Sequence, residues 1–187
     1  MFQRMSDDIK DKVLPQTLNQ LAADAKRDMA TEISREFNVT RSAALDAIRV
    51  DKATVNAGRF YMTARLYVPP RPKGRGFNLI RFVENKVTFA EAKRRKKGGT
   101  LAQLRVKIKR SGGVKVIPNA FIGNNGRTVF ARVGKGRLPI KALTTVDTAQ
   151  MFMTRRINSK VVDKIKASAA YVLRDKIAKV IQGQRPD

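Results

Sequence analysis

Apolar side chains recur at helical spacing in the first part of the chain. Between residues 14 and 37 an apolar residue returns every three or four positions, so these side chains share one face of an amphipathic helix. Pro15 is compatible only with the first turn of that helix, and Asn38 marks its end. Thr40 is a suitable N-cap for a short second helix over residues 41–48, and the pair predicts a helical hairpin facing the core. The expected apolar stripe consists of Leu14, Leu18, Leu21, Ala25, Met29, Ile33 and Phe37.

A second helical pattern begins near the other end of the chain. Asp147 and Gln150 have the spacing of a weaker capping box, in which two side chains satisfy backbone N–H groups reciprocally. Apolar residues then recur every fourth position until Gly183, which predicts a long C-terminal helix. Asn158-Ser159 is a candidate interruption, since Ser159 is a suitable N-cap for a new start. The periodic positions are Ile157, Val161, Ile165, Ala169, Leu173, Ile177 and Ile181.

The first part of the middle region is typical of strands. Residues 48–56 and 59–68 are rich in β-branched and aromatic side chains and flank the turn sequence Asn56-Ala57-Gly58, which predicts a hairpin. The following PPRPKGRG, residues 69–76, predicts a basic loop. Residues 77–87 form a short apolar element whose type the pattern leaves open.

Three further strands are expected over residues 101–110, 114–122 and 128–133, with turn sequences between them. Together they predict an antiparallel meander with one core face and one basic face. Within it we expect three side chains to fill the core, and Pro118 and Pro139 to shape strand ends. The fold class is therefore α+β, with N-terminal helices and a long C-terminal helix packed on a small, mainly antiparallel sheet that carries basic loops. The expected core side chains are Phe121, Ile122 and Phe130.

Positive charge is concentrated in the middle of the chain. Residues 1–50 hold eight basic and eight acidic side chains, residues 51–146 hold 23 and 3, and residues 147–187 hold 9 and 4. We expect these to be an N-terminal helical region, a basic β-rich region and a C-terminal helix of one structural domain. The excess in residues 51–146 is larger than solubility requires, and it predicts contact with a polyanion or an acidic protein surface.

The cations of the middle region fall into three groups. One group lies in the loop 69–76, and a second ends a helix expected over residues 88–97, where it complements the negative helix end. The third alternates with apolar residues along 101–110, which makes one strand face wholly cationic. Because the chain has no Trp and only three Tyr, nucleic acid would be bound through its phosphates and not by base stacking. The candidate contact residues are Arg71, Lys73, Arg75, Lys93, Arg94, Arg95, Lys96, Lys97, Arg105, Lys107, Lys109 and Arg110.

The side chains that usually carry catalysis are missing. The chain has neither Cys nor His, so we expect no catalytic residues, no metal site and no cofactor, and we predict a protein that is not an enzyme. The acidic residues of the first 50 positions alternate with basic ones and predict a solvated helix face or an interface rim. Glycine pairs such as Gly98-Gly99 lack the spacing of a phosphate-binding loop and indicate turns. Neither a signal peptide nor an apolar run of membrane-spanning length is apparent, so we expect a chain made in the cytoplasm with no membrane partner.

The stretch from Val114 to Phe152 carries a specific motif. It reads K-x-IP-x-AFI, then a turn, a hairpin partner that ends at Arg132, and R-LPI ahead of the C-terminal helix. The motif residues are Lys115, Ile117, Pro118, Ala120, Phe121, Ile122, Arg137, Leu138, Pro139 and Ile140. With these residues the chain resembles the prophage minor tail protein Z family, the tail completion proteins of long-tailed bacteriophages. The resemblance covers about 40 residues well and most of the chain loosely through the order of its elements.

The resemblance implies a structural virion protein at the head-proximal end of the tail. There it would act with the tail terminator to complete the tube and prepare it for the neck or connector proteins. Such proteins assemble as rings, with six copies expected from tail symmetry, and closed rings need heterologous interfaces. We expect the helices to supply these interfaces, and the basic sheet and loops to face a lumen that holds the genome end or the tape-measure protein.

The charge distribution also fits a stand-alone nucleic-acid-binding protein of ribosomal or nucleoid type. Such a module would bind DNA or RNA by itself, and its log affinity would fall with log salt concentration. A tail protein would instead need partner rings and bind weakly alone. A third class, a nuclease with a carboxylate metal centre, would require Mg²⁺-dependent cleavage, which we do not expect.

Overall fold

The chain has an α+β fold made of two compact units. The first, here called the helical unit, comprises Met1–Ile33, Arg41–Pro69 and Phe152–Asp187, and the second, the sheet unit, comprises Ser34–Thr40 and Pro70–Met151. Each unit is assembled from segments far apart in sequence, so neither unit coincides with one of the three consecutive regions of the sequence. The computed structural model describes residues 9–54, 62–69, 76–85, 90, 94, 103–134 and 138–182.

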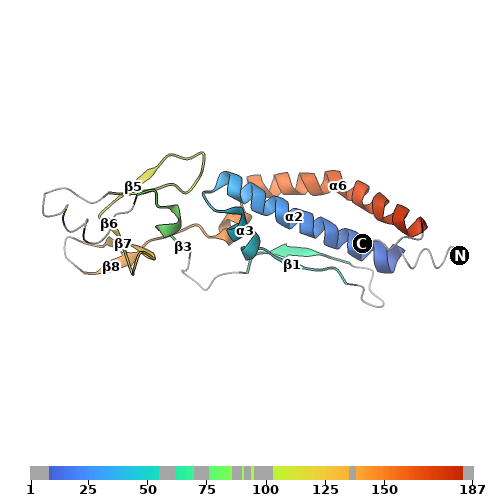
Figure 1. Cartoon of the computed structure of the whole chain (residues 1–187), viewed down its shortest axis with the longest axis horizontal. Coiled ribbons are helices and arrows are strands. Elements are labelled where there is room, and N and C mark those ends of the chain that lie inside the picture. Colours follow the sequence, from blue (N-terminus) through green and yellow to red (C-terminus); the bar gives the residue numbers. More distant parts are fainter. Residues whose placement is uncertain are drawn as a thin grey trace. The chain divides into compact units, whose positions relative to one another are not determined.

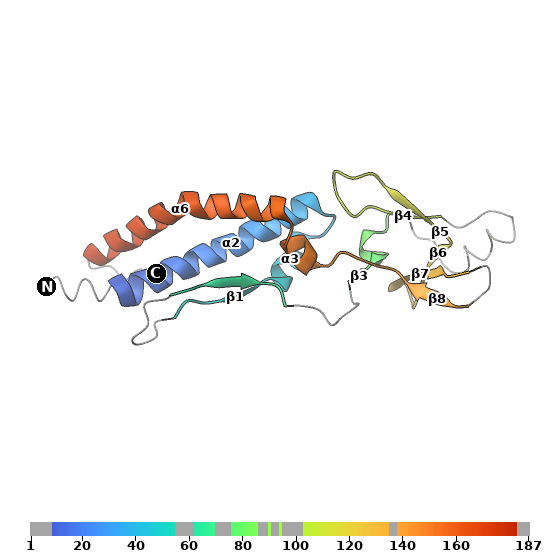
Figure 2. The same cartoon turned by 180° about the vertical axis from the view of Figure 1, so that it is seen from behind.

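Two long helices dominate the helical unit. Helix α2 (Leu14–Glu36) and helix α6 (Arg155–Ile181) lie side by side in both views (Figures 1 and 2). They run in opposite directions, because the end of α2 is joined by ion pairs to the start of α6, while the π-helical turn η1 (Ile9–Val13) ahead of α2 contacts α6. Helix α3 (Arg41–Ala47) follows, as predicted for the second element of the N-terminal pair. Of the helices described, none is both long and apolar enough to cross a membrane.

The apolar stripes of the two helices are buried unequally. On α2, Ala25, Met29 and Ile33 are buried. On α6, Ile157 and Val161 are buried, but the later positions of the predicted stripe are only half-buried and the last is exposed. The reason is geometric: a four-residue step overshoots one helical turn by about 40°, so a strict four-residue repeat winds around the helix. The stripe therefore meets α2 only near the start of α6.

The capping box predicted at the C-terminal pattern is present. The backbone N–H of Gln150 donates to Asp147 Oδ1 (2.9 Å), and the N–H of Asp147 donates to Gln150 Oε1 (3.2 Å). This box starts a short helix, α5 (Thr148–Phe152), and α6 begins after Thr154. The interruption expected at Asn158-Ser159 was wrongly placed, because Ser159 lies inside α6 and its hydroxyl donates to a backbone carbonyl of the preceding turn.

The predicted hairpin is formed by β1 (Arg49–Asp51) and β2 (Arg65–Tyr67), which pair antiparallel. Its turn, Asn56-Ala57-Gly58, lies outside the described residues. Asn19 of α2 fixes the chain after β1, since its side chain donates to the carbonyl of Ala53 (3.1 Å) and accepts from the N–H of the same residue (2.7 Å). The side chain of Asn19 thereby satisfies the backbone N–H and C=O of Ala53, a residue outside the described strands.

The sheet unit contains three separate sheets within the described residues, and this corrects the predicted meander. Residues 114–122 do not form one strand, because Asn119 adopts a left-handed conformation (φ 58°) that divides them. The first half pairs with residues of 101–110, and the second half belongs to a different, three-stranded sheet. The sheets are β4 (Gln103–Val106) with β5 (Lys115–Pro118); β6 (Ala120–Gly123), β7 (Thr128–Arg132) and β8 (Ile140–Ala142); and β3 (Phe77–Asn78) with β9 (Thr144–Thr145).

A small core joins these sheets. The element left open over residues 77–87 is strand β3 followed by a 3₁₀ turn, η2 (Leu79–Phe82). Phe82, Leu104 and Val129 are fully buried there, and η2 contacts β7. The pairing of β3 with β9 requires Gly76, because a Cβ at this position would clash with the backbone carbonyl of Thr145.

Candidate interaction surface

Strand β4 carries the alternation that the sequence predicted. Leu104 and Val106 are buried, while Arg105 between them is exposed. Beyond the strand, Lys107 is half-buried and its backbone N–H donates to the carbonyl of Phe82 (2.8 Å). Within the described residues, the side chains of Arg105 and Lys107 make no ion pair, so their charges are available to a partner.

The other two cations of this segment are tied to the C-terminal end of α2. Arg110 donates from Nε to the carbonyl of Ser34 (2.7 Å) and from its backbone N–H to the carbonyl of Glu36 (2.9 Å). Lys109 Nζ lies 3.6 Å from the Glu36 carboxylate and 5.7 Å from the centre of the Phe37 ring. The last carbonyls of a helix have no partner within it, and cations stabilise its negative end. Arg110 and Lys109 therefore have a structural task that the sequence analysis did not separate from binding.

The remaining predicted cations belong to the loop 69–76 and to the segment 88–97. Arg94 is helical and exposed. The predicted contact residues that lie outside the described residues are Arg71, Lys73, Arg75, Lys93, Arg95, Lys96 and Lys97.

The sheet unit exposes further cations that the sequence analysis did not select for contact. Counting only its described residues, the unit has eleven basic and three acidic side chains, and nine of the eleven basic ones are exposed. Composition reveals this excess, but only the strand register shows which of these side chains stand on open faces. The additional exposed cations include Arg81, Lys115, Arg127 and Lys141.

Acidic residues of α2 form a second charged cluster. Glu32 is only 4% exposed, and Lys160 Nζ (3.3 Å) and Lys164 Nζ (3.6 Å) reach its carboxylate from α6. Lys164 Nζ also lies 3.0 Å from Asp28, and this hydrogen bond is the main cause that raises the pKa of Lys164 above its ordinary 10.5. Asp28 and Glu32 thus join two helices of one unit. Nowhere in the described residues do three or more Asp, Glu, His or Cys side chains converge in a way that could hold a metal ion.

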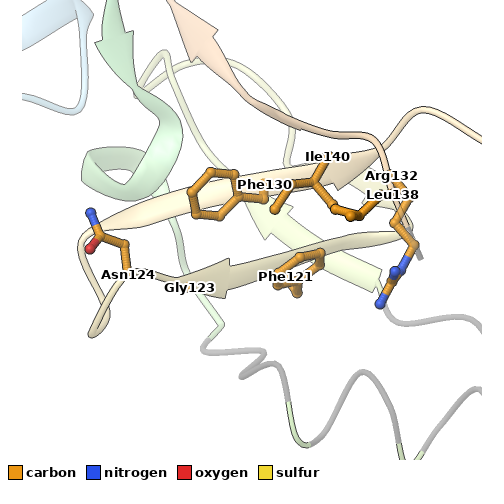
Figure 3. Close-up of a pocket in the computed structure, with 7 residues that line it drawn as sticks. All are labelled: Phe121, Gly123, Asn124, Phe130, Arg132, Leu138 and Ile140. Carbon is orange, nitrogen blue, oxygen red and sulfur yellow. The ribbon is translucent and has the colours of Figure 1, made fainter.

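The three-stranded sheet has a hollow of about 580 Å³ on one face (Figure 3). The register places Phe121 opposite Phe130 and Arg132 opposite Ile140, so these four side chains share this face. The two phenyl rings have centroids 6.0 Å apart, and the guanidinium carbon of Arg132 lies 5.5 Å from the centre of the Phe121 ring. The lining residues are Phe121, Gly123, Asn124, Phe130, Arg132, Leu138 and Ile140.

Local backbone chemistry keeps this hollow open. Gly123 has no side chain where a Cβ would come within 3.1 Å of the Phe130 ring, so the ring can lie across the neighbouring strand. Asn124 and Asn125 adopt positive φ angles of 52° and 51°, which closes the turn between β6 and β7. Leu138 is 72% exposed although it is fully apolar. The hollow is therefore an apolar surface that the described residues of the sheet unit do not cover.

The hollow corrects the expected core. Phe121 is buried as predicted, but Phe130 is only half-buried and both line the hollow. Ile122 lies on the opposite face of the sheet together with the buried Val129. The sequence alone could not distinguish the two faces, because both carry apolar residues.

The motif residues lie on these same strands. Lys115, Ile117 and Pro118 belong to β5, Ala120, Phe121 and Ile122 belong to β6, and Ile140 begins β8 after Leu138 and Pro139. Pro118 ends one strand and Pro139 precedes another, as expected, while Arg137 lies outside the described residues.

No family model matches the chain, and no curated protein and no solved structure matches it either. The resemblance to the minor tail protein Z family therefore stays a prediction that depends on the motif residues.

Proposed function

We propose that this chain is a structural virion protein that completes the head-proximal end of a phage tail as a ring of copies joined to the tail terminator and the neck or connector proteins. The charge of the sheet unit supports this function most directly. Its described residues carry eleven basic against three acidic side chains, mostly exposed. A surface of this kind is stable only beside an acidic or polyanionic partner, or at a cost in self-repulsion.

Exposed apolar surface supports assembly with other proteins. Leu138 and Ile140 are exposed beside the hollow, and Val114 and Val116 are exposed on and next to β5. Exposed apolar side chains that lie together, as Leu138 and Ile140 do beside the hollow, are typical of surfaces that another protein covers. A protein that binds only nucleic acid has no use for such a face, whereas a ring subunit needs one.

Arg105 and Lys107 are the cations that we expect to contact the partner. In a ring at the tail end they would contact the phosphates of the genome end, or the acidic surface of a protein that passes through the lumen. Because the chain has no Trp and only three Tyr for stacking on bases, these contacts would be electrostatic and independent of base sequence.

Gold-labelled antibody against this protein, imaged on phage particles by negative-stain electron microscopy, tests the proposal. We expect label where the tail meets the head. Label on the capsid surface, at the tail tip, or on no particle would contradict it. The functional variant combines Arg105→Ala with Lys107→Ala and is expected to lower the fraction of tails joined to heads. Its matched control combines Arg49→Ala with Lys52→Ala, two exposed cations of the β1 segment outside the helices, and should leave that fraction unchanged.

A stand-alone nucleic-acid-binding protein is the second candidate, favoured by Arg105 and Lys107, whose side chains make no ion pair with any described residue. Fluorescence anisotropy with random-sequence double-stranded DNA, measured over a series of salt concentrations, separates the two. For the second candidate we expect affinity well beyond the non-specific range of about 10⁻⁴–10⁻⁶ M near physiological salt. A tail protein by itself should remain within that range.

A further inference from the structure

The hollow on the three-stranded sheet has a definite chemical preference. Its floor is apolar, and its described lining residues include the cation Arg132 and no acidic side chain. Figure 3 places Arg132 and Asn124 at opposite ends of the hollow, with Phe130, Leu138 and Ile140 between them. An occupant that matches this surface has a large apolar side chain followed closely by carboxylates.

The size and position of the hollow favour a short segment as its occupant. A volume of about 580 Å³ accommodates a few side chains, and not the broad face of a folded subunit. Strand β8 borders the hollow and lies at the edge of its sheet, and its residues Ile140, Lys141 and Ala142 are all exposed. Among the described strands, none pairs with the free side of β8, so its backbone groups are open to an added extended segment.

The chain's own sequence contains one segment with this chemistry. Residues 1–8, MFQRMSDD, place the apolar Phe2 and Met5 ahead of Asp7-Asp8, the only two adjacent acidic residues in the whole sequence. These eight residues lie outside the described residues.

We infer that the hollow beside β8 binds residues 2–8 of a second copy of the chain, with Met5 or Phe2 in the apolar part and the two aspartates near Arg132. Two copies of a chain with a net charge of +25 repel each other. The side chains of residues 2–8, with Arg4, Asp7 and Asp8, sum to −1, so this segment is attracted to a basic surface that repels most of the chain. Segment and hollow are different surfaces, so the contact is heterologous and can continue from copy to copy around a ring. The contact does not depend on the proposed function, because it requires only copies of this chain.

Disulfide cross-linking between single-cysteine variants tests this contact, because the natural chain has no cysteine. One full-length batch carries Met5→Cys and another, distinguished by a mass tag, carries Leu138→Cys. The batches are mixed and oxidised with copper phenanthroline, and the heterodimer is measured by non-reducing electrophoresis. The control batch carries Met153→Cys, whose side chain is 75% exposed against 72% for Leu138. We expect Met5→Cys to cross-link to Leu138→Cys about tenfold faster than to Met153→Cys, as a preferential contact requires.

Charge variants test the recognition itself. Asp7→Asn with Asp8→Asn in the Met5→Cys batch, or Ile140→Asp in the Leu138→Cys batch, should reduce the rate to that of the Met153→Cys control. Equal rates for Leu138→Cys and Met153→Cys would overturn the inference. A chain that carries both Met5→Cys and Leu138→Cys provides a second way to overturn it. If this chain forms an intramolecular disulfide while the mixed single variants do not react, the segment binds the hollow of its own chain and not that of a second copy. None of these results affects the antibody-labelling test of the tail function.

Discussion

The buried carboxylate of Glu32 joins the two long helices through ion pairs. It is 4% exposed, while the side chains of Lys160 and Lys164 that reach it are 52% and 44% exposed. Replacing both lysines by Ala leaves the carboxylate in place without either ammonium group. Breaking a fully buried ion pair from one side costs about 3–5 kcal/mol, and water screens part of this loss where the partners are half exposed. We expect the Lys160→Ala, Lys164→Ala variant to lose about 2–3 kcal/mol of unfolding free energy.

Urea denaturation followed by far-UV circular dichroism measures this loss, because the helices dominate the signal and the chain has no Trp. Adding Glu32→Gln to the double variant removes the buried negative charge and should restore about 1–2 kcal/mol. The matched control, Lys166→Ala with Arg174→Ala, removes the same charge from exposed positions of α6 and should change stability by about 0.5 kcal/mol or less. If the double lysine variant is as stable as this control, the two lysines do not stabilise the buried carboxylate.

Three further predictions concern single positions. A hydrogen bond to Asp28 raises the pKa of Lys164 in the folded state. The contribution of Lys164 to the unfolding free energy is therefore complete below its ordinary pKa of 10.5, and it is lost as pH rises through the higher pKa of the folded state. Urea denaturation over about pH 8–11 should therefore show a smaller decline for Lys164→Gln than for the natural chain. Arg110→Ala should lower the unfolding free energy by about 1 kcal/mol in thermal melts, whereas Arg105→Ala should leave it within about 0.5 kcal/mol. Gly76→Ala should cost about 1–3 kcal/mol in the same assay, and Gly113→Ala, where a Cβ meets nothing within 4 Å, is its control.

The helices were predictable because their signals are local. The apolar spacing of α2 and the reciprocal pair Asp147 and Gln150 lie within a few turns of chain, and both were placed correctly. The start of α6 was not, because Ser159 resembles a cap in sequence but donates to a helical carbonyl in the structure. A Ser side chain can cap the start of a helix or donate to a carbonyl inside one, and tertiary packing determines which of these occurs.

The candidate surface was only partly predictable. The alternation along β4 identified Arg105 as an exposed cation, but nothing local indicated that Arg110 binds Ser34, which precedes it by 76 residues. The hollow was missed for a related reason. Whether Phe130 faces the core or the open side depends on how β7 registers with both neighbours, and on Asn119 dividing the preceding strand.

The pairing of β3 with β9 has a consequence for engineering the chain. These two short strands pair residues 77–78 with residues 144–145. The polypeptide between them therefore begins and ends at the same place in the structure. Additions at the tight turn Asn124-Asn125-Gly126 would lengthen that excursion without altering the spacing of its two ends. An epitope or fluorescent label inserted there would therefore leave the pairing of β3 with β9 intact.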